Sequence, residues 1–329
     1  MSDIPSIRIL CPDNGSGLSR DAAIIQRTLN ERLPDVEVEW LDTRGGIVPR
    51  GTVDVQLHLE IVDERTLKSG LVNVLIPNPE WFFRNWIFTL RSFDYVFCKT
   101  HHAAHVMRSY WVPQDRIVYT GFTSVDMMRK SQYRVPAFAH FAGVSEAKGT
   151  NEVIQAFKQM PDIRLTVYAR GVNERLCERL TKGVKNIDVV SGKLKEEDYA
   201  IELNKHLFHV CPSTYEGFGH YINEARSVGA LIITTNAEPM NELVNNTHGL
   251  LVSCTQGKKQ GLVRHSIPSI SSIVEAVQAL ASTAHEHRVI ETLSRRTRER
   301  YELDDEQFQT LFTEAIQTAI IKAKKYALR

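Results

Sequence analysis

The chain is an alternation of strands and helices that runs through most of its 329 residues and starts again after Pro136. Six short apolar runs before that proline are typical of buried strands: 7–10, 36–40, 53–59, 71–76, 94–98 and 116–120. Six more follow it: 137–142, 163–169, 187–190, 207–211, 230–234 and 249–252. Segments with apolar residues at helical spacing separate most of these runs, which predicts parallel sheets with helices on both faces. Twelve strands are too many for one comfortable sheet, so we expect two doubly wound α/β domains.

The two halves of the chain begin alike, with a strand, a glycine-containing loop and a helix, in 7–29 and again in 138–160. Ligands of open α/β sheets bind beyond the carboxyl ends of the strands, so two such edges facing each other would form one cleft. We expect domains at 1–130 and 135–305, with a last helix at 306–329 that crosses back to the first domain. The polar, proline-containing segment 131–137 predicts the linker. Residues 254–266 predict an exposed loop.

The bulk composition is that of a soluble globular protein, with 43% apolar and 24% charged residues and a net charge of +1. Such a balance gives no field that draws nucleic acid or an anionic membrane. The five cysteines include no metal-type pair, and the N-terminus lacks the features of a signal peptide. No apolar run approaches the roughly 20 residues of a membrane-spanning helix. We therefore expect a cytoplasmic protein with reduced thiols, and the oligomeric state stays open.

The segment STYEGFGHYINEARSVGA at 213–230 combines two acids, two glycines and the start of a helix. On a helix over 220–229, Glu224 lies at the border of the apolar arc, with Asn223, Arg226 and Ser227 outside it. A carboxylate at that border is partly desolvated and needs a partner. Gly217 and Gly219 allow backbone amides to approach a ligand, and the helix start favours anions. Such a site suits a molecule that carries both hydroxyls and phosphate.

Residues 212–252 resemble the E-x7-E region of family-4 retaining glycosyltransferases of the GT-B fold. The similarity covers Pro212-Ser213, Glu216-Gly217-Phe218-Gly219, Glu224-Ala225, Gly229, Glu242 and Gly249-Leu250-Leu251-Val252, in order and at the spacing of that family. Upstream, Lys148-Gly149 resembles the strand–loop–helix of the same family, and 189–213 resembles its base-binding stretch. The N-terminal half matches only in outline. The resemblance implies two Rossmann-like domains facing a central cleft.

The resemblance also implies an activity, namely transfer of a sugar with retention from a GDP- or UDP-sugar to a hydroxyl of a glycan or glycoconjugate. It assigns catalytic roles to Glu216 and Lys148, with the latter supporting the leaving diphosphate. The amides of Gly217, Phe218 and Gly219 would hold the donor sugar together with Glu216. The nucleotide would be bound by residues of both domains, and the acceptor by residues of the first. The implied nucleotide-binding residues are Glu224, Lys148, Gly15, Gly17, Arg170, Gly192, Lys193 and Leu194. The implied acceptor-side residues are Asn78, Glu80, His101 and His102.

The chain departs from the family pattern at two places. The family usually has an arginine four residues before the lysine, and here that position is Val144. Arg170 or Lys193 would have to supply the missing cation. Where members often carry a histidine after the fourth strand, this chain has Asn78 and Glu80. No Asp-x-Asp triplet occurs, so a divalent metal is possible but not expected, and no cofactor is obligatory. The implied partners are the nucleotide sugar and a carbohydrate or glycoconjugate acceptor.

Competing interpretations remain for several features. Glu216 and Glu224 are also compatible with a turn glutamate and a structural ion pair. The histidines of 100–107 suggest a metal site, but no acid or cysteine lies near, and Thr100 predicts a helix N-cap.

The aromatic segment 80–93 predicts a helix with a core stripe, formed by Phe82, Phe83, Trp86, Ile87, Leu90 and Phe93. Trp81 and Phe88 lie opposite, where packing on a neighbouring element is favoured over contact with a sugar or a membrane surface. At the level of function, the alternatives are an inactive nucleotide-sugar-binding protein and another GT-B enzyme, such as an epimerase or a phosphorylase.

Overall fold

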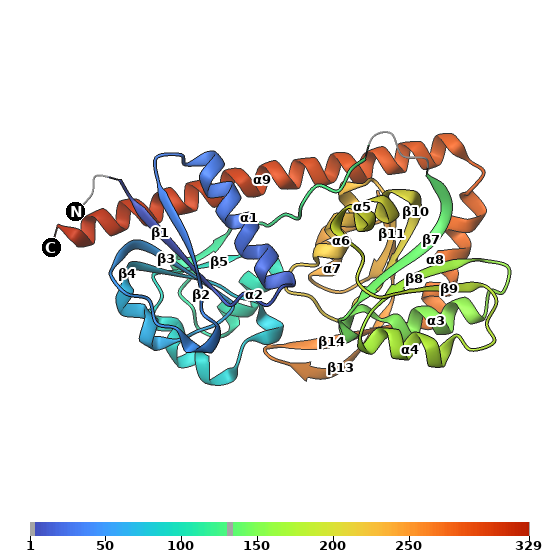
Figure 1. Ribbon diagram of the computed structural model, residues 1–329, viewed down its shortest axis with the longest axis horizontal. Helices are drawn as coiled ribbons and strands as arrows, with labels where there is room; N and C mark the ends of the chain where they lie inside the picture. Colours follow the sequence, from blue (N-terminus) through green and yellow to red (C-terminus); the bar gives the residue numbers. More distant parts are fainter. Residues whose placement is uncertain (1–3, 130–133, 329) are drawn as a thin grey trace. The chain divides into compact units, whose positions relative to one another are not determined.

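The computed structural model describes residues 4–129 and 134–328, so residues 131–133 of the expected linker lie outside the described residues. The chain divides into two compact units (Figure 1). Unit 1 comprises Met1–Thr123, Gln260–Val263 and Asp304–Arg329, and unit 2 comprises Ser124–Lys259 and Arg264–Leu303. Each unit contains one six-stranded sheet, and the strands that pair within these two sheets run parallel throughout the described residues. The two doubly wound α/β domains expected from the alternating pattern are thus confirmed.

Unit 1 has the strand order β2-β1-β3-β4-β5-β6, and its order reverses beside β1. Its strands are β1 (Ser6–Cys11), β2 (Glu37–Asp42), β3 (Val53–Leu59), β4 (Gly70–Ile76), β5 (Tyr95–Cys98) and β6 (Ile117–Tyr119). Its helices are α1 (Gly17–Arg32), α2 (His101–Ser109), and the 3-10 helices η1 (Arg44–Gly46), η2 (Glu64–Ser69), η3 (Pro79–Trp81), η4 (Arg84–Ser92) and η5 (Gln114–Arg116). Thr100 caps α2 as expected, because its Oγ1 accepts a hydrogen bond from the Ala103 amide.

Unit 2 has the strand order β12-β11-β10-β7-β8-β9, the 6-5-4-1-2-3 pattern of a dinucleotide-binding sheet. Its strands are β7 (Val135–Gly143), β8 (Leu165–Ala169), β9 (Ile187–Ser191), β10 (His206–Cys211), β11 (Leu231–Thr235) and β12 (Gly249–Val252). Its helices are η6 (Glu146–Lys148), α3 (Thr150–Lys158), α4 (Val172–Leu180), α5 (Glu196–Lys205), α6 (His220–Ser227), α7 (Met240–Leu243) and α8 (Ile270–Thr283). All twelve strands expected from the apolar runs are present in the two sheets.

The C-terminal helix α9 (His287–Ala327) is longer than the sequence pattern predicted. It starts at His287 rather than near 305, and it passes from unit 2 into unit 1 between Leu303 and Asp304 without interruption. Within unit 1, its Phe308 and Phe312 are buried. Phe308 packs on Phe122, and Phe312 packs on Phe97 of β5. These late residues therefore complete the core of the first sheet.

Two segments fold differently from their predictions. The expected exposed loop at 254–266 forms the β13–β14 hairpin, made of β13 (Cys254–Gln260) and β14 (Val263–Pro268). Its turn residues Leu262 and Val263 pack on the apolar core of unit 1, a contact that local sequence does not reveal.

The aromatic segment forms η3 and η4 instead of one α-helix, so the predicted stripe is broken. Phe82, Leu90 and Phe93 are buried, whereas Phe83 is exposed. Trp81 and Phe88 are also exposed, which contradicts the favoured packing interpretation.

Candidate functional site

The site in unit 2 lies where the strand order of its sheet reverses, at the neighbouring carboxyl ends of β7 and β10 (Figure 1). The loops that follow these strands are bonded to each other, since the Thr214 amide donates to the Ala147 carbonyl at 2.7 Å. Gly149 has a positive φ of 67°, and a Cβ there would collide with the Pro212 carbonyl oxygen. Glycine is therefore required at the position where the two loops meet.

Lys148 and Glu216, the two residues with predicted catalytic roles, form an ion pair across these loops. Lys148 Nζ lies 2.6 Å from Glu216 Oε1, and both side chains are largely buried. Ser213 Oγ donates to the same oxygen, and the lysine ammonium lies 3.7 Å from the centre of the Tyr221 ring. The fold thus brings together two charges that are 68 residues apart in the chain.

The glycine-rich turn leads directly into α6, with Gly219 as N-cap at a φ of 107°. Gly217, Phe218 and Gly219 are buried beside this helix start. Glu224 is only 1% exposed, and its Oε2 accepts a hydrogen bond of 2.7 Å from the Tyr199 hydroxyl of α5. The need for a partner at this carboxylate is confirmed.

The expected polar face of α6 is wrong in one respect. Asn223, Arg226 and Ser227 are all buried, because the helix is covered on every side. Arg226 contacts Asn223 Oδ1 at 2.7 Å, and the Ser227 hydroxyl donates to the Glu224 carbonyl. These hydrogen bonds stabilise part of the buried polar surface of this helix inside unit 2.

The candidates to replace the missing arginine lie at the same edge of the sheet. Arg170 directly follows β8, and its amide donates to the Gly143 carbonyl at 3.1 Å, beside Val144. None of the ion pairs found among the described residues involves Arg170. Lys193 is exposed in the loop after β9, one strand further from β7. Its neighbour Gly192 bonds the Ala169 carbonyl with a φ of 94°, and Leu194 is partly buried.

Gly15 and Gly17 lie in the β1–α1 loop of unit 1, where a Cβ at either position would meet open space. The Gly15 amide is already bonded to Asp13 Oδ1 and to Ser19 Oγ, at 3.2 and 2.9 Å. Hydrogen bonds from Ser19 and from this amide lower the pKa of Asp13. In this conformation, a carboxylate rather than an open anion site lies at the loop.

The predicted acceptor-side residues also belong to unit 1. Asn78 and Glu80 are buried after β4, and Asn78 Nδ2 donates to Glu60 Oε2 at 2.7 Å. His101 is exposed at the start of α2, with its ring stacked on Tyr119 at 3.8 Å, and His102 is partly buried. Glu60 was missed by the sequence reasoning, because a glutamate after an apolar strand is ordinary in sequence.

Tyr199 and Tyr221 were also missed, and no local signal marks them as partners of Glu224 and Lys148. Among residues 4–129 and 134–328, no group of three or more His, Cys, Asp or Glu side chains is arranged to hold a metal ion. No helix in this part of the chain is long and apolar enough to cross a membrane.

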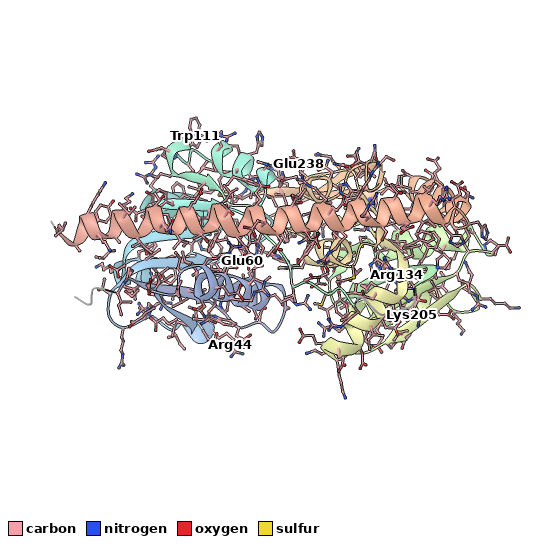
Figure 2. The ribbon with its side chains drawn as sticks, turned by 90° about the horizontal axis from the view of Figure 1, so that it is seen from above. Arg44, Glu60, Trp111, Arg134, Lys205 and Glu238 are labelled. Carbon is pink, nitrogen blue, oxygen red and sulfur yellow. The ribbon has the colours of Figure 1, made fainter. Side chains whose placement is uncertain are left out.

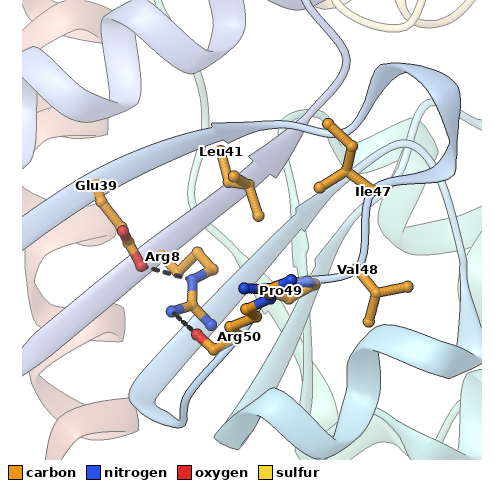
Figure 3. A pocket seen from close by; sticks show the side chains of 7 residues that line it. All are labelled: Arg8, Glu39, Leu41, Ile47, Val48, Pro49 and Arg50. Carbon is orange, nitrogen blue, oxygen red and sulfur yellow. Dashed lines mark hydrogen bonds and ion pairs between the residues drawn. The ribbon is translucent and has the colours of Figure 1, made fainter.

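A pocket of about 240 Å³ lies on unit 1 beside β1, β2 and the loop that follows β2 (Figure 3). Its polar wall is Arg8, which pairs with Glu39 on the adjacent strand at 2.5 Å and donates to the Arg50 carbonyl. Its apolar wall is formed by Leu41, Ile47, Val48 and Pro49. Each of the three guanidinium nitrogens of Arg8 donates to the protein, and two of the acceptors are the Arg50 and Gly51 carbonyls, so this arginine fixes the end of the 47–51 loop.

Residues 135–267 match the family model described as glycosyl transferases group 1. The match includes Lys148, Glu216 and Glu224, and it supports a glycosyltransferase domain in this region. No curated protein matches the chain.

Solved structures resemble the chain over nearly its whole length, at low sequence identity. A glycosyltransferase from Rickettsia africae ESF-5 is 11% identical with a TM-score of 0.71, and the alignment covers 97% of this chain and 99% of that one. Anabaena Alr3699/HepE in complex with UDP and glucose is 14% identical with a TM-score of 0.67, covering 95% and 100%. A chain of the GtfA/B complex is 17% identical with a TM-score of 0.61, covering 82% of this chain and 58% of that one. These likenesses, with the two parallel sheets, confirm the GT-B fold.

Proposed function

We propose that this GT-B chain, with its glycosyl transferases group 1 region, is a retaining family-4 glycosyltransferase. Its donor would be a GDP- or UDP-sugar, and its acceptor a hydroxyl of a glycan or glycoconjugate. The reaction needs no resident metal, since a lysine, backbone amides and a helix start provide the anion-binding groups.

The observation that carries this proposal is the pairing of Lys148 with Glu216 where the unit 2 sheet order reverses. This edge is where open α/β sheets bind their ligands, so the ion pair lies where a charged ligand would meet it. Glu224 is anchored on the next helix, eight residues after Glu216. The three residues offer one cation and two carboxylates, as a diphosphate, a hexose and a ribose require.

We infer that the donor replaces the ion pair. Lys148 turns from Glu216 to the diphosphate, which leaves the carboxylate free to accept hydrogen bonds from hydroxyls of the sugar. The bond between the sugar C1 and the diphosphate oxygen breaks, and the acceptor oxygen bonds C1 on the same face. The acceptor's hydroxyl proton passes to the leaving diphosphate. Lys148 stabilises the charge that develops on that leaving group.

Arg170 is the better candidate for the cation that Val144 does not supply. Its backbone is bonded next to Val144, and its guanidinium is in no ion pair among the described residues. Arg170→Ala should therefore reduce turnover more than Lys193→Ala does. Equal turnover in wild type and both variants would exclude both residues.

The test of the proposed function is a thermal-shift screen with UDP-, GDP- and ADP-sugars, followed by product analysis with the donor that binds. Ligand bound to the folded state raises the midpoint, by an amount set by its concentration over Kd. Glu224→Ala should abolish most of the shift, and Glu216→Gln should mainly reduce sugar transfer. The control is Glu196→Gln, an exposed carboxylate at the start of α5. The absence of a shift with every nucleotide sugar contradicts the proposal.

A nucleotide-sugar-binding protein without transfer activity is the second candidate, favoured by the exposed Val144 at the arginine position. This candidate and the transferase both predict a thermal shift. They differ in donor turnover, because only the enzyme releases nucleoside diphosphate on incubation with the sugar donor. An epimerase or a phosphorylase would instead interconvert donors or consume phosphate.

A further inference from the structure

The unit 1 sheet has its own reversal of strand order between β1 and β3, and Glu60 is the first residue after β3. Figure 2 labels this residue. Its φ is 64°, although it is not a glycine, and Ile61 N donates to Leu59 O at 2.7 Å around it. This is a three-residue turn of the rare positive-φ kind, which costs backbone strain. The strain fixes a glutamate at the edge where ligands of open sheets bind.

The Glu60 carboxylate is poorly compensated by the protein. It is partly buried, and its one hydrogen bond among the described residues comes from Asn78. Burial raises its pKa, Asp21 adds to this rise, and the hydrogen bond from Asn78 and the charge of Lys99 oppose it. Lys99 Nζ lies 2.8 Å from Asp21 Oδ2, and both side chains are buried, so the Asp21 carboxylate largely compensates the charge of Lys99.

The side-chain oxygen of Asn78 is a second acceptor, beside the Glu60 carboxylate, that the described residues leave without a hydrogen bond. The residue is 8% exposed, and Oδ1 has no hydrogen-bond partner among the described residues, while Nδ2 is directed at Glu60. A buried carbonyl oxygen without a donor is costly and needs an explanation. Glu60 and Asn78 together therefore form a connected pair of hydrogen-bond acceptors in need of donors.

We propose that Glu60 and Asn78 bind two neighbouring hydroxyls of an uncharged sugar acceptor, an inference that rests on the proposed transferase function. Hydroxyl groups supply the O–H donors that both oxygens lack. A phosphorylated or carboxylated acceptor would place negative charge against Glu60, and Lys99 is already neutralised by Asp21. A metal ion is a poorer occupant, because one carboxylate and one amide oxygen do not make a complete ligand set.

The test uses the full chain and saturation-transfer NMR with the methyl glycosides of glucose, galactose, mannose and N-acetylglucosamine. Wild type should give a saturation-transfer signal with at least one glycoside. Glu60→Gln and Asn78→Ala should each raise the Kd of that glycoside about tenfold or more. The glutamine variant keeps an oxygen for Asn78 Nδ2, so the loop is expected to remain folded. Glu37→Gln, an exposed carboxylate on β2, is the control and should bind as wild type does.

A second readout is kinetic, with whichever of UDP-glucose, UDP-galactose, UDP-N-acetylglucosamine and GDP-mannose gives the largest thermal shift. The acceptor KM should rise by about tenfold in Glu60→Gln, more than the donor KM does. In wild type, it should also rise as acid protonates Glu60.

The outcomes separate the two claims. If no nucleotide sugar binds or turns over, the proposed function fails, and the NMR experiment still decides the site. The site is overturned if no glycoside binds to wild type, if both variants keep the wild-type Kd, or if only anionic glycosides such as methyl glucuronide bind.

Discussion

Lys148 is held by two different interactions, an ion pair with Glu216 and a contact with the face of the Tyr221 ring. The ring contact attracts the cation without satisfying a hydrogen bond, so the ammonium is stabilised in place and remains able to exchange its carboxylate for a phosphate. The Tyr221 ring thus stabilises the Lys148 ammonium even while its anionic partner is exchanged.

Lys148→Met should reduce kcat by about 10²- to 10³-fold, because it removes the charge opposite the leaving diphosphate while keeping a side chain of similar length. Steady-state kinetics with the donor found in the thermal-shift screen would measure the loss. Lys182→Met, an exposed lysine of unit 2, is the matched control. A turnover within a few-fold of wild type would remove Lys148 from the mechanism.

Glu60→Gln should stabilise unit 1 at neutral pH. Because the folded state raises the pKa of Glu60 above its ordinary 4.5, the folded state binds more protons than the unfolded state between the two values. Stability is therefore lost as pH rises through that window, and a neutral glutamine avoids the loss. The thermal midpoint of the variant should exceed that of wild type at pH 7 to 8, with a difference that shrinks towards pH 4. A difference that grows in acid would contradict the raised pKa.

The residues that we propose as the donor site of unit 2 could be singled out from sequence, since Glu216, the glycines and Glu224 lie within one short segment whose spacing is characteristic. Their partners could not. Tyr199 reaches Glu224 from another helix, and Glu60 meets Asn78 only because β3 and β4 are adjacent in the sheet. Such pairs depend on tertiary packing, which a single sequence does not encode locally.

At the level of elements, the strands were predictable because buried parallel strands are continuous apolar runs bounded by polar loops. The β13–β14 hairpin was not, since its strands are polar and its stability comes from contacts far away in the chain. Leu262 N donates to Pro79 O at 2.9 Å, and Ser266 N donates to Thr214 O at 2.7 Å. The prediction of one helix over 80–93 was wrong for the opposite reason. Its apolar residues have helical spacing, but the segment folds into the 3-10 helices η3 and η4.

Gly261→Ala should displace the hairpin turn. A Cβ there would lie 2.5 and 2.6 Å from the carbonyl oxygens of Glu80 and Pro79, in a backbone with a φ of 55°. We expect a loss on the order of 2 to 3 kcal/mol in the free energy of unfolding and faster amide exchange at Leu262. Gly51→Ala, with a similar φ of 75° but open space around the Cβ, should cost about 1 kcal/mol. Equal losses in the two variants would mean that the contact contributes nothing.

Across the whole molecule, neutral histidines are buried in both sheets. Burial is the main cause that lowers the pKa of His58 and His140 to about 4 and that of His209 to about 3. His140 bonds Val210 O and Thr150 Oγ1, which leaves no room for hydration of a charged ring. Each of these histidines opposes folding once the unfolded chain becomes protonated.

The thermal midpoint should therefore fall steeply as pH decreases from about 6.5 to 4. In that window, the unfolded state binds more protons than the folded state, so the free energy of unfolding decreases as the pH decreases. For His140 alone, the loss at pH 4 is on the order of 3 kcal/mol. Thermal unfolding in a series of buffers would measure the slope. A midpoint that stays constant down to pH 4.5 would contradict it, whereas paired carboxylates such as Asp42, with a pKa of about 2, act only at lower pH.

The closure of the unit 1 core by the end of α9 has a consequence for synthesis. Phe97 and Phe122 leave the ribosome early, but Phe308 and Phe312, which cover them, are translated about 200 residues later. Unit 1 is thus translated first but completed last, and part of its apolar surface stays exposed while unit 2 is translated. A premature stop before Phe308 would release a chain whose first sheet lacks both of the phenylalanines that cover it.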